Sequence, residues 1–150
     1  MLAAGLLLGA CATGNLSDDE RLALYRDHAG APVPAFDMFG GKPDGWTPLG
    51  DAALAVWTRP KQGYLVELRG HCQDLDWSEA ITLTNQGGRV SARFDKVLVV
   101  GGPTNPTRMP CYIDSIRPLD VTALRAAEKH LREAGAAERD SVPAPAPQGS

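Results

Sequence analysis

Short apolar runs, separated by turns rich in glycine and proline, occupy the chain between residues 33 and 118. In one run, Tyr64, Val66 and Leu68 alternate with residues of the opposite face, which is typical of a strand with two distinct faces. The runs with strand character are Ala35–Phe39, Trp46–Leu49, Ala53–Thr58, Gly63–Leu68, Ile81–Thr84, Val90–Phe94, Lys96–Val100 and Cys111–Ile116. The pattern therefore predicts that the middle of the chain is β-rich.

The turns between these runs predict how some of them pair. The runs on either side of Arg59–Gln62 are predicted to form one hairpin, and those on either side of Asn85–Gly88 a second one. His71–Glu79 is predicted to be a loop or a single helical turn. Gly101–Pro110 holds three prolines and two glycines, which predicts a loop.

Helical signals stand at the two ends of this β-rich region. Ser17–Glu20 fits a capping box, in which Ser17 is the N-cap and Glu20 reaches back to it. The apolar side of the first helix would be Leu22, Tyr25 and Ala29, with Gly30 ending the helix. Asp120 is predicted to cap a second helix that ends at Gly135. The inner face of that second helix would be Val121, Leu124, Ala127 and Leu131.

Together these elements predict an α+β fold without βαβ alternation. We expect an antiparallel sheet, or a small partly open barrel, of about six to eight strands with an N-terminal and a C-terminal helix packed on it. Residues 17–137 would form this single domain, and the Pro/Ala-rich residues 138–150 a disordered tail. If Trp57 shares a face with Ala53 and Ala55, that face is expected to pack under the first helix.

The first residues of the chain indicate that the domain is exported. Leu8-Gly9-Ala10-Cys11 follows an apolar run and reads as a lipobox, so residues 1–10 are predicted to be a signal peptide and residues 11–16 a tether lipidated at Cys11. The segment has no Lys or Arg and is shorter than the roughly 15–30 residues of a usual signal, so we expect the true start to lie upstream. The alternative is a buried N-terminal helix. Ala12 is not the Asp that retains lipoproteins in the inner membrane, which favours the outer membrane.

Two further cysteines fit this export. Cys72 and Cys111 remain after Cys11, and in an oxidising periplasm an even pair is expected to form a disulfide. Closing that loop would contribute roughly 4 kcal/mol in the chain-entropy model. The alternative takes His71 and Cys72 as base and nucleophile, but neighbours in an extended strand point to opposite faces.

Composition and charge exclude some partners. A net charge of −3 argues against nucleic-acid binding, and 43% hydrophobic with 22% charged residues is ordinary for a globular protein. Arg89 and Arg93 are expected on one face of their strand, since positions two apart point the same way. With Arg59 and Lys61 on a neighbouring hairpin they would form a modest basic rim, which is the candidate binding surface. Its alternative is a solvated strand edge, where positive charge discourages edge pairing.

Other chemistry is not indicated by the sequence. The three histidines are scattered, so no metal site is predicted, and Asp74 with Asp76 reads as a solvated loop rather than an acid/base or calcium pair. The glycine pairs do not open a helix after a strand, and no Gly-x-Ser-x-Gly elbow is present. No catalytic residue and no cofactor is therefore predicted.

One succession of residues runs through most of the mature chain: Leu24–Arg26, Ala29–Val33, Trp46, Leu49–Asp51, Leu54, Val56–Thr58, Pro60, Tyr64–Val66, Cys72, Leu75, Phe94, Asp95, Val97, Cys111–Ile113 and Ile116–Pro118. This succession resembles a family of small proteobacterial lipoproteins known only as domain of unknown function 6491. The resemblance implies an exported lipoprotein, strengthens the pairing of Cys72 with Cys111 and carries over no catalytic residues. The short, uncharged N-terminus departs from the family.

Three functions follow as hypotheses. We expect a lipoprotein at the periplasmic face of the outer membrane that binds or scaffolds an envelope protein or cell-wall component without catalysis. The alternative is an inhibitor or immunity protein against a cell-wall-degrading enzyme or toxin, whose rigid loop Gly101–Pro110 would plug a cleft. The third is an enzyme, which would need a concave polar pocket around His71 or Asp74.

Overall fold

The computed structural model describes residues 16–100 and 110–141 and has the predicted α+β class. The helices are α1 (Asp18–Asp27) and α2 (Val121–Ser141), and two 3₁₀ turns are η1 (Phe39–Gly41) and η2 (Leu75–Trp77). The strands are β1 (Ala35–Asp37), β2 (Gly45–Pro48), β3 (Ala53–Arg59), β4 (Gln62–Leu68), β5 (Ala80–Leu83), β6 (Arg89–Ser91), β7 (Lys96–Val100) and β8 (Pro110–Pro118). Residues 1–15, 101–109 and 142–150, including the predicted lipidation site Cys11 and most of the predicted loop Gly101–Pro110, lie outside the described residues.

Six strands form one strongly curled antiparallel sheet, an open half-barrel, in the order β2-β3-β4-β8-β7-β5. Its pairings include the predicted β3–β4 hairpin. The second predicted hairpin is wrong, because β5 pairs with β7 and β6 pairs with β1 in a separate two-stranded sheet. The turn between β5 and β6 is closed by backbone hydrogen bonds between Gln86 and Arg89. The Gly88 carbonyl also accepts a hydrogen bond from the Met38 N–H at 2.8 Å, which places the start of β6 beside the end of β1.

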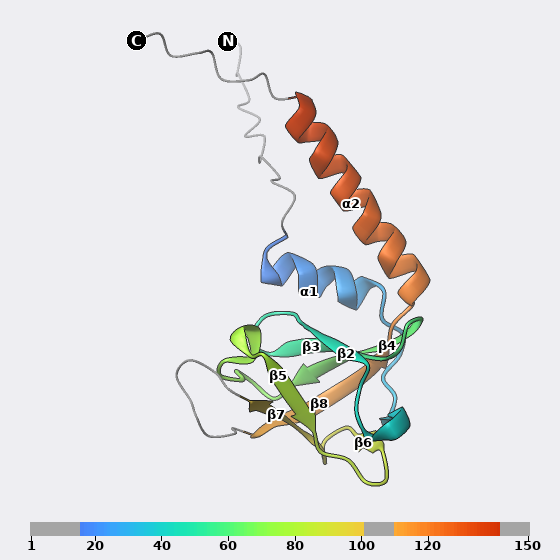
Figure 1. Cartoon of the computed structure of the whole chain (residues 1–150), viewed down its shortest axis with the longest axis vertical. Coiled ribbons are helices and arrows are strands. Elements are labelled where there is room, and N and C mark those ends of the chain that lie inside the picture. The colour runs from blue at the N-terminus through green and yellow to red at the C-terminus, as the bar shows by residue number, and fades with distance from the viewer. Residues whose placement is uncertain (1–15, 101–109, 142–150) are drawn as a thin grey trace, which may run out of the picture.

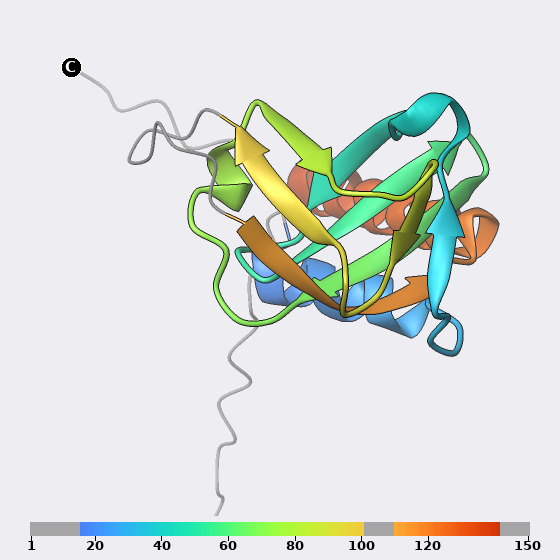
Figure 2. The same ribbon diagram turned by 90° about the horizontal axis from the view of Figure 1, so that it is seen from below.

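The curled sheet separates two apolar cores. On its inner face the small sheet contributes Phe36 and Val90, and Phe36 stacks on Tyr64 of β4. On its outer face α1 and the first turns of α2 cover Ala53, Ala55 and Leu65, as expected for the small-residue side of β3. Seen from below, the helices lie behind the sheet and the small sheet lies beside it (Figure 2).

The helix under which Trp57 was expected to pack is α1. The Trp57 ring lies edge-on to Tyr25 of α1, 6.4 Å between centroids, and across Gly63 of the neighbouring strand. A Cβ at Gly63 would overlap the Trp57 ring, so only glycine leaves room for this side chain. Burial and the nearby Glu128 carboxylate, to which the Tyr25 hydroxyl donates at 3.0 Å, raise the pKa of Tyr25.

The predicted start of α1 is confirmed and both predicted helix ends are wrong. Ser17 and Glu20 form the capping box, and the hydrogen bonds from Ser17 lower the pKa of Glu20. The helix ends before Gly30, at Asp27, with His28 as C-cap. The second helix runs through Gly135 to Ser141, because the alanines beside Gly135 offset the roughly 1 kcal/mol that a glycine costs inside a helix.

Beyond its first turns, α2 extends away from the sheet (Figure 1). Val121 and Leu124 are in the outer core, whereas Leu131 is 42% exposed. Among the described helices, none has the length and apolar character needed to cross a membrane.

A disulfide joins Cys72 and Cys111, as predicted, with their Cα atoms 5.7 Å apart. It ties the segment after β4 to β8, and Leu75 of η2, three residues after Cys72, lies in the inner core. A few residues further on, β8 carries a bulge: Glu67 pairs with Ser115 and Leu68 with Ile113, so Asp114 is the extra residue. The bulge stands where β8 leaves β4 and begins to pair with β7.

Candidate functional site

A groove of about 570 Å³ lies beside the small sheet. Three segments line it: the extended stretch Pro32–Ala35 that leads into β1, residues 114–116 of β8 at the bulge, and residues 91–94 after β6, joined by Arg89. Its volume lies in the range usual for ligand pockets, about 300–1,000 Å³. We call this surface, with those lining residues, the groove.

The turn after β6, residues 91–95, is held by a buried carboxylate. Asp95 is 9% exposed and accepts hydrogen bonds from the Ser91 N–H and the Thr84 hydroxyl, both at 2.7 Å. The turn is also tied to β8, because the Arg93 N–H donates to the Ile113 carbonyl at 2.8 Å. These hydrogen bonds fix the backbone that carries the exposed side chains of Arg93 and Phe94.

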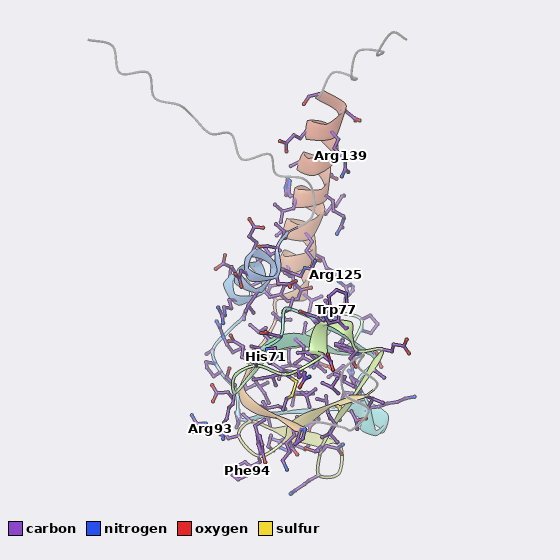
Figure 3. All side chains as sticks on the ribbon, turned by 90° about the vertical axis from the view of Figure 1, so that its left-hand side faces the viewer. His71, Trp77, Arg93, Phe94, Arg125 and Arg139 are labelled. Carbon is purple, nitrogen blue, oxygen red and sulfur yellow. A yellow bond between two sulfur atoms is a disulfide. The ribbon has the colours of Figure 1, made fainter. Side chains whose placement is uncertain are left out.

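Arg93 and Phe94 are the side chains that this turn exposes. Arg93 has φ of 70°, a left-handed conformation that is uncommon for a residue with a long side chain. Phe94 is 82% exposed, the highest value among the exposed large hydrophobic residues of the described chain. Both lie at the end of the domain opposite to α2 (Figure 3). A strained conformation held by buried partners is common at ligand-binding positions.

The predicted basic rim is divided by the structure. Arg89 and Arg93 both line the groove, although β6 ends at Ser91 and Arg93 therefore does not share a strand face with Arg89. Arg59 and Lys61 are not among its lining residues. The Arg59 guanidinium lies 4.0 Å from the centroid of the Phe39 ring, and Lys61 is in the β3–β4 turn. Sequence reasoning missed Phe94 as a site residue, and its only sign was the Phe94-Asp95 pair within the family resemblance.

A second, smaller cavity of about 240 Å³ lies next to the disulfide and is lined by Asp51, His71 and residues 73–77. We call it the acidic corner. The Asp51 carboxylate lies 2.5 Å from His71 Nδ1, and both side chains are more than half exposed. The pKa of Asp76 is raised, first by its partial burial and then by the carboxylates of Asp18 and Asp51.

The acidic corner does not assemble the nucleophile and base considered above. Cys72 is fully buried and bonded to Cys111, so it offers no thiolate. His71 contacts a carboxylate instead. Within residues 16–100 and 110–141, no group of three or more His, Cys, Asp or Glu side chains is placed to hold a metal ion.

The fold and the groove define a small disulfide-braced α+β domain with an open, partly basic groove. The model of a family described as "Family of unknown function (DUF6491)" matches residues 1–135, and the chain belongs to that family. No curated protein and no solved structure matches the chain.

Proposed function

We propose that this protein is a lipid-anchored envelope protein that binds a partner through the groove and does not catalyse a reaction. The observation that supports this best is the turn after β6, in which the buried carboxylate of Asp95 holds Arg93 and Phe94 at the surface. Phenylalanine is usually buried, so an exposed Phe94 that lines the groove on a braced turn supports a binding role.

The direction of the groove agrees with an anchor at Cys11. The chain enters the domain at α1, which packs on the outer face of the sheet, whereas β6 and the groove belong to the small sheet on its inner side. An anchor at Cys11 would reach the described domain at α1, on the face of the sheet opposite to the small sheet, so it would leave the groove accessible to a partner in the periplasm. The partner would then be an envelope protein or a cell-wall component.

Lipidation is tested in a Gram-negative host by expressing the gene together with the sequence upstream of Met1, as the wild type and as Cys11→Ser. We expect the wild-type protein to sediment with the outer membrane, with a mature N-terminus at Cys11 that carries acyl chains by mass spectrometry. The Cys11→Ser variant should lose the acyl mass and appear in the soluble fraction. A wild-type protein that keeps Met1, or that is soluble without acyl chains, would refute the anchor.

Binding is tested by placing a photo-crosslinking amino acid at position 94, with position 131 on the exposed part of α2 as the matched control. We expect crosslinks to a defined envelope component from position 94 and not from position 131. Equal background from both positions would contradict a binding role for the groove. Crosslinks to a cell-wall hydrolase, with loss of its activity, would point to the inhibitor alternative instead.

A further inference from the structure

The groove contains a positive charge that the described residues do not neutralise. Asp114 lines the groove and Asp37 lies in β1 beside it, and each is already paired: Asp37 with Arg89 at 3.2 Å, and Asp114 with Arg69 at 3.7 Å. Arg93 forms no ion pair with any carboxylate in the described ranges. An unpaired guanidinium beside a groove fits an anionic group, which it binds through two parallel hydrogen bonds when that group is a carboxylate.

The shape of the groove favours an extended chain as its occupant. Small side chains, those of Ala35, Ser91, Ala92 and Ser115, are among its lining residues. A polypeptide backbone can therefore approach closely. Pro32 and Pro34 have no N–H group, so that wall contributes few donors for an added strand and recognition must rely on side-chain contacts.

The charge density of the surface does not favour a membrane. Attraction to anionic lipids usually needs clusters of about four to eight basic residues. The groove has two arginines, one of them paired with Asp37, and it also has the carboxylate of Asp114. A single unpaired guanidinium beside an exposed aromatic ring is better matched to one carboxylate next to an apolar side chain.

We propose that the groove binds an extended segment of a partner polypeptide in which an acidic side chain neighbours an apolar one. The carboxylate of the partner pairs with Arg93, and its apolar side chain packs between Phe94 and the side of the groove formed by Pro32 and Pro34. This inference rests on the proposed function and names its partner chemistry. Because Asp95 braces the turn, little conformational freedom of the protein is lost on binding.

The test is a display selection of random 12-residue peptides against the full-length, disulfide-bonded chain. We expect enriched peptides to carry Asp or Glu next to an apolar residue and to shift the NMR signals of residues 32–35, 89–94 and 114–116. For such a peptide, Arg93→Gln should weaken binding by at least about tenfold, because a charge-assisted hydrogen bond is lost. Phe94→Ala should weaken it by a similar factor, and higher salt should weaken wild-type binding.

Lys61→Gln is the matched control, since Lys61 is an exposed cation outside the groove, and it should bind like the wild type. Unchanged NMR signals outside the groove show that each variant is folded. The proposal is overturned if no peptide is enriched, if enriched peptides lack acidic residues, or if Arg93→Gln and Lys61→Gln behave alike. Co-sedimentation with phosphatidylglycerol vesicles without peptide binding would also overturn it, in favour of a lipid surface. The Cys11 and crosslinking results remain independent of these outcomes, so failure of the peptide inference is distinguishable from failure of the proposed function.

Discussion

Two surface turns in the described part of this domain hold a non-glycine residue in the left-handed conformation. The side chains that stabilise the two turns differ in how deeply they are buried. Arg93 beside the groove has φ of 70°, and Asp74 in the acidic corner has φ of 63°. Aspartate is one of the residues that adopt this conformation readily, because its short side chain bonds to nearby backbone. Arginine has no such advantage, so its conformation must be imposed by its surroundings.

The surroundings differ in burial. The groove turn is fixed by Asp95, a buried carboxylate with two short hydrogen bonds, whereas the Asp51–His71 contact in the acidic corner joins two exposed side chains. Exposed pairs contribute about 0–1 kcal/mol, and buried hydrogen-bonded groups contribute more. The comparison therefore separates a turn fixed by a buried carboxylate from a corner in which the Asp51–His71 pair is exposed. What braces the acidic corner is the disulfide.

Removing the disulfide is expected to have the largest effect. In the double variant Cys72→Ser, Cys111→Ser the free energy of unfolding, measured in urea, should fall by about 4 kcal/mol. The reason is that the two positions, 39 apart in sequence, are no longer linked in the unfolded chain, whose conformational entropy therefore rises. Hydrogen exchange should increase more in residues 72–78 than in the groove turn. Equal acceleration in both regions would show that they are not separately braced.

Removing the carboxylate of Asp95 is expected to be the next largest effect. Asp95→Ala leaves the Ser91 N–H and the Thr84 hydroxyl without their acceptor, which should cost about 2–4 kcal/mol in urea unfolding. Asp95→Asn keeps the shape and part of the bonding, so its loss should be smaller. An Asp95→Ala chain as stable as the wild type would show that the turn needs no brace.

The strain at Arg93 predicts a stabilising substitution. Arg93→Gly should raise the free energy of unfolding by up to about 1 kcal/mol, because glycine adopts a positive φ without steric cost. Arg93→Ala removes the same side chain but keeps the strain, so it is the matched control and should give no gain. Asp74→Gly should also give no gain. The difference between the two glycine variants, measured as a shift in Tm, checks whether strain is specific to the groove turn.

The local elements of this fold were predictable where one short-range signal was strong. The capping box at Ser17 and the alternation in β4 predicted α1 and the β3–β4 hairpin, and the cysteine count predicted the disulfide. The pairing of β1 with β6 was not predictable. These strands have three residues each and pair Asp37 with Arg89 across 52 positions, and the turn at Asn85–Gly88 is the signal of a different hairpin.

The groove was predictable only in part, for the same reason. Arg89 and Arg93 were selected by charge, but charge alone also selected Arg59 and Lys61, which are not among the groove's lining residues. The residue that organises the turn is Asp95, which bonds to Thr84 eleven positions earlier. A buried carboxylate in a polar turn has no periodic signature. Its role becomes visible only when the backbone around it is known.

The smallest effect distinguishes the two regions by pH. The pKa of Asp76 is raised in the folded state by partial burial and by Asp18 and Asp51, so the folded protein holds this proton more tightly than the unfolded chain does. Its contribution to stability is therefore fully present below the ordinary pKa of 3.8 and is lost as pH rises through the folded-state value. Asp76→Asn should raise Tm slightly at pH 7, and this gain should shrink as the pH approaches 3.8. Asp19→Asn, at an exposed carboxylate in the first turn of α1, is the control. A gain from Asp76→Asn that is the same at both pH values would mean that it comes from packing and not from charge repulsion in the acidic corner.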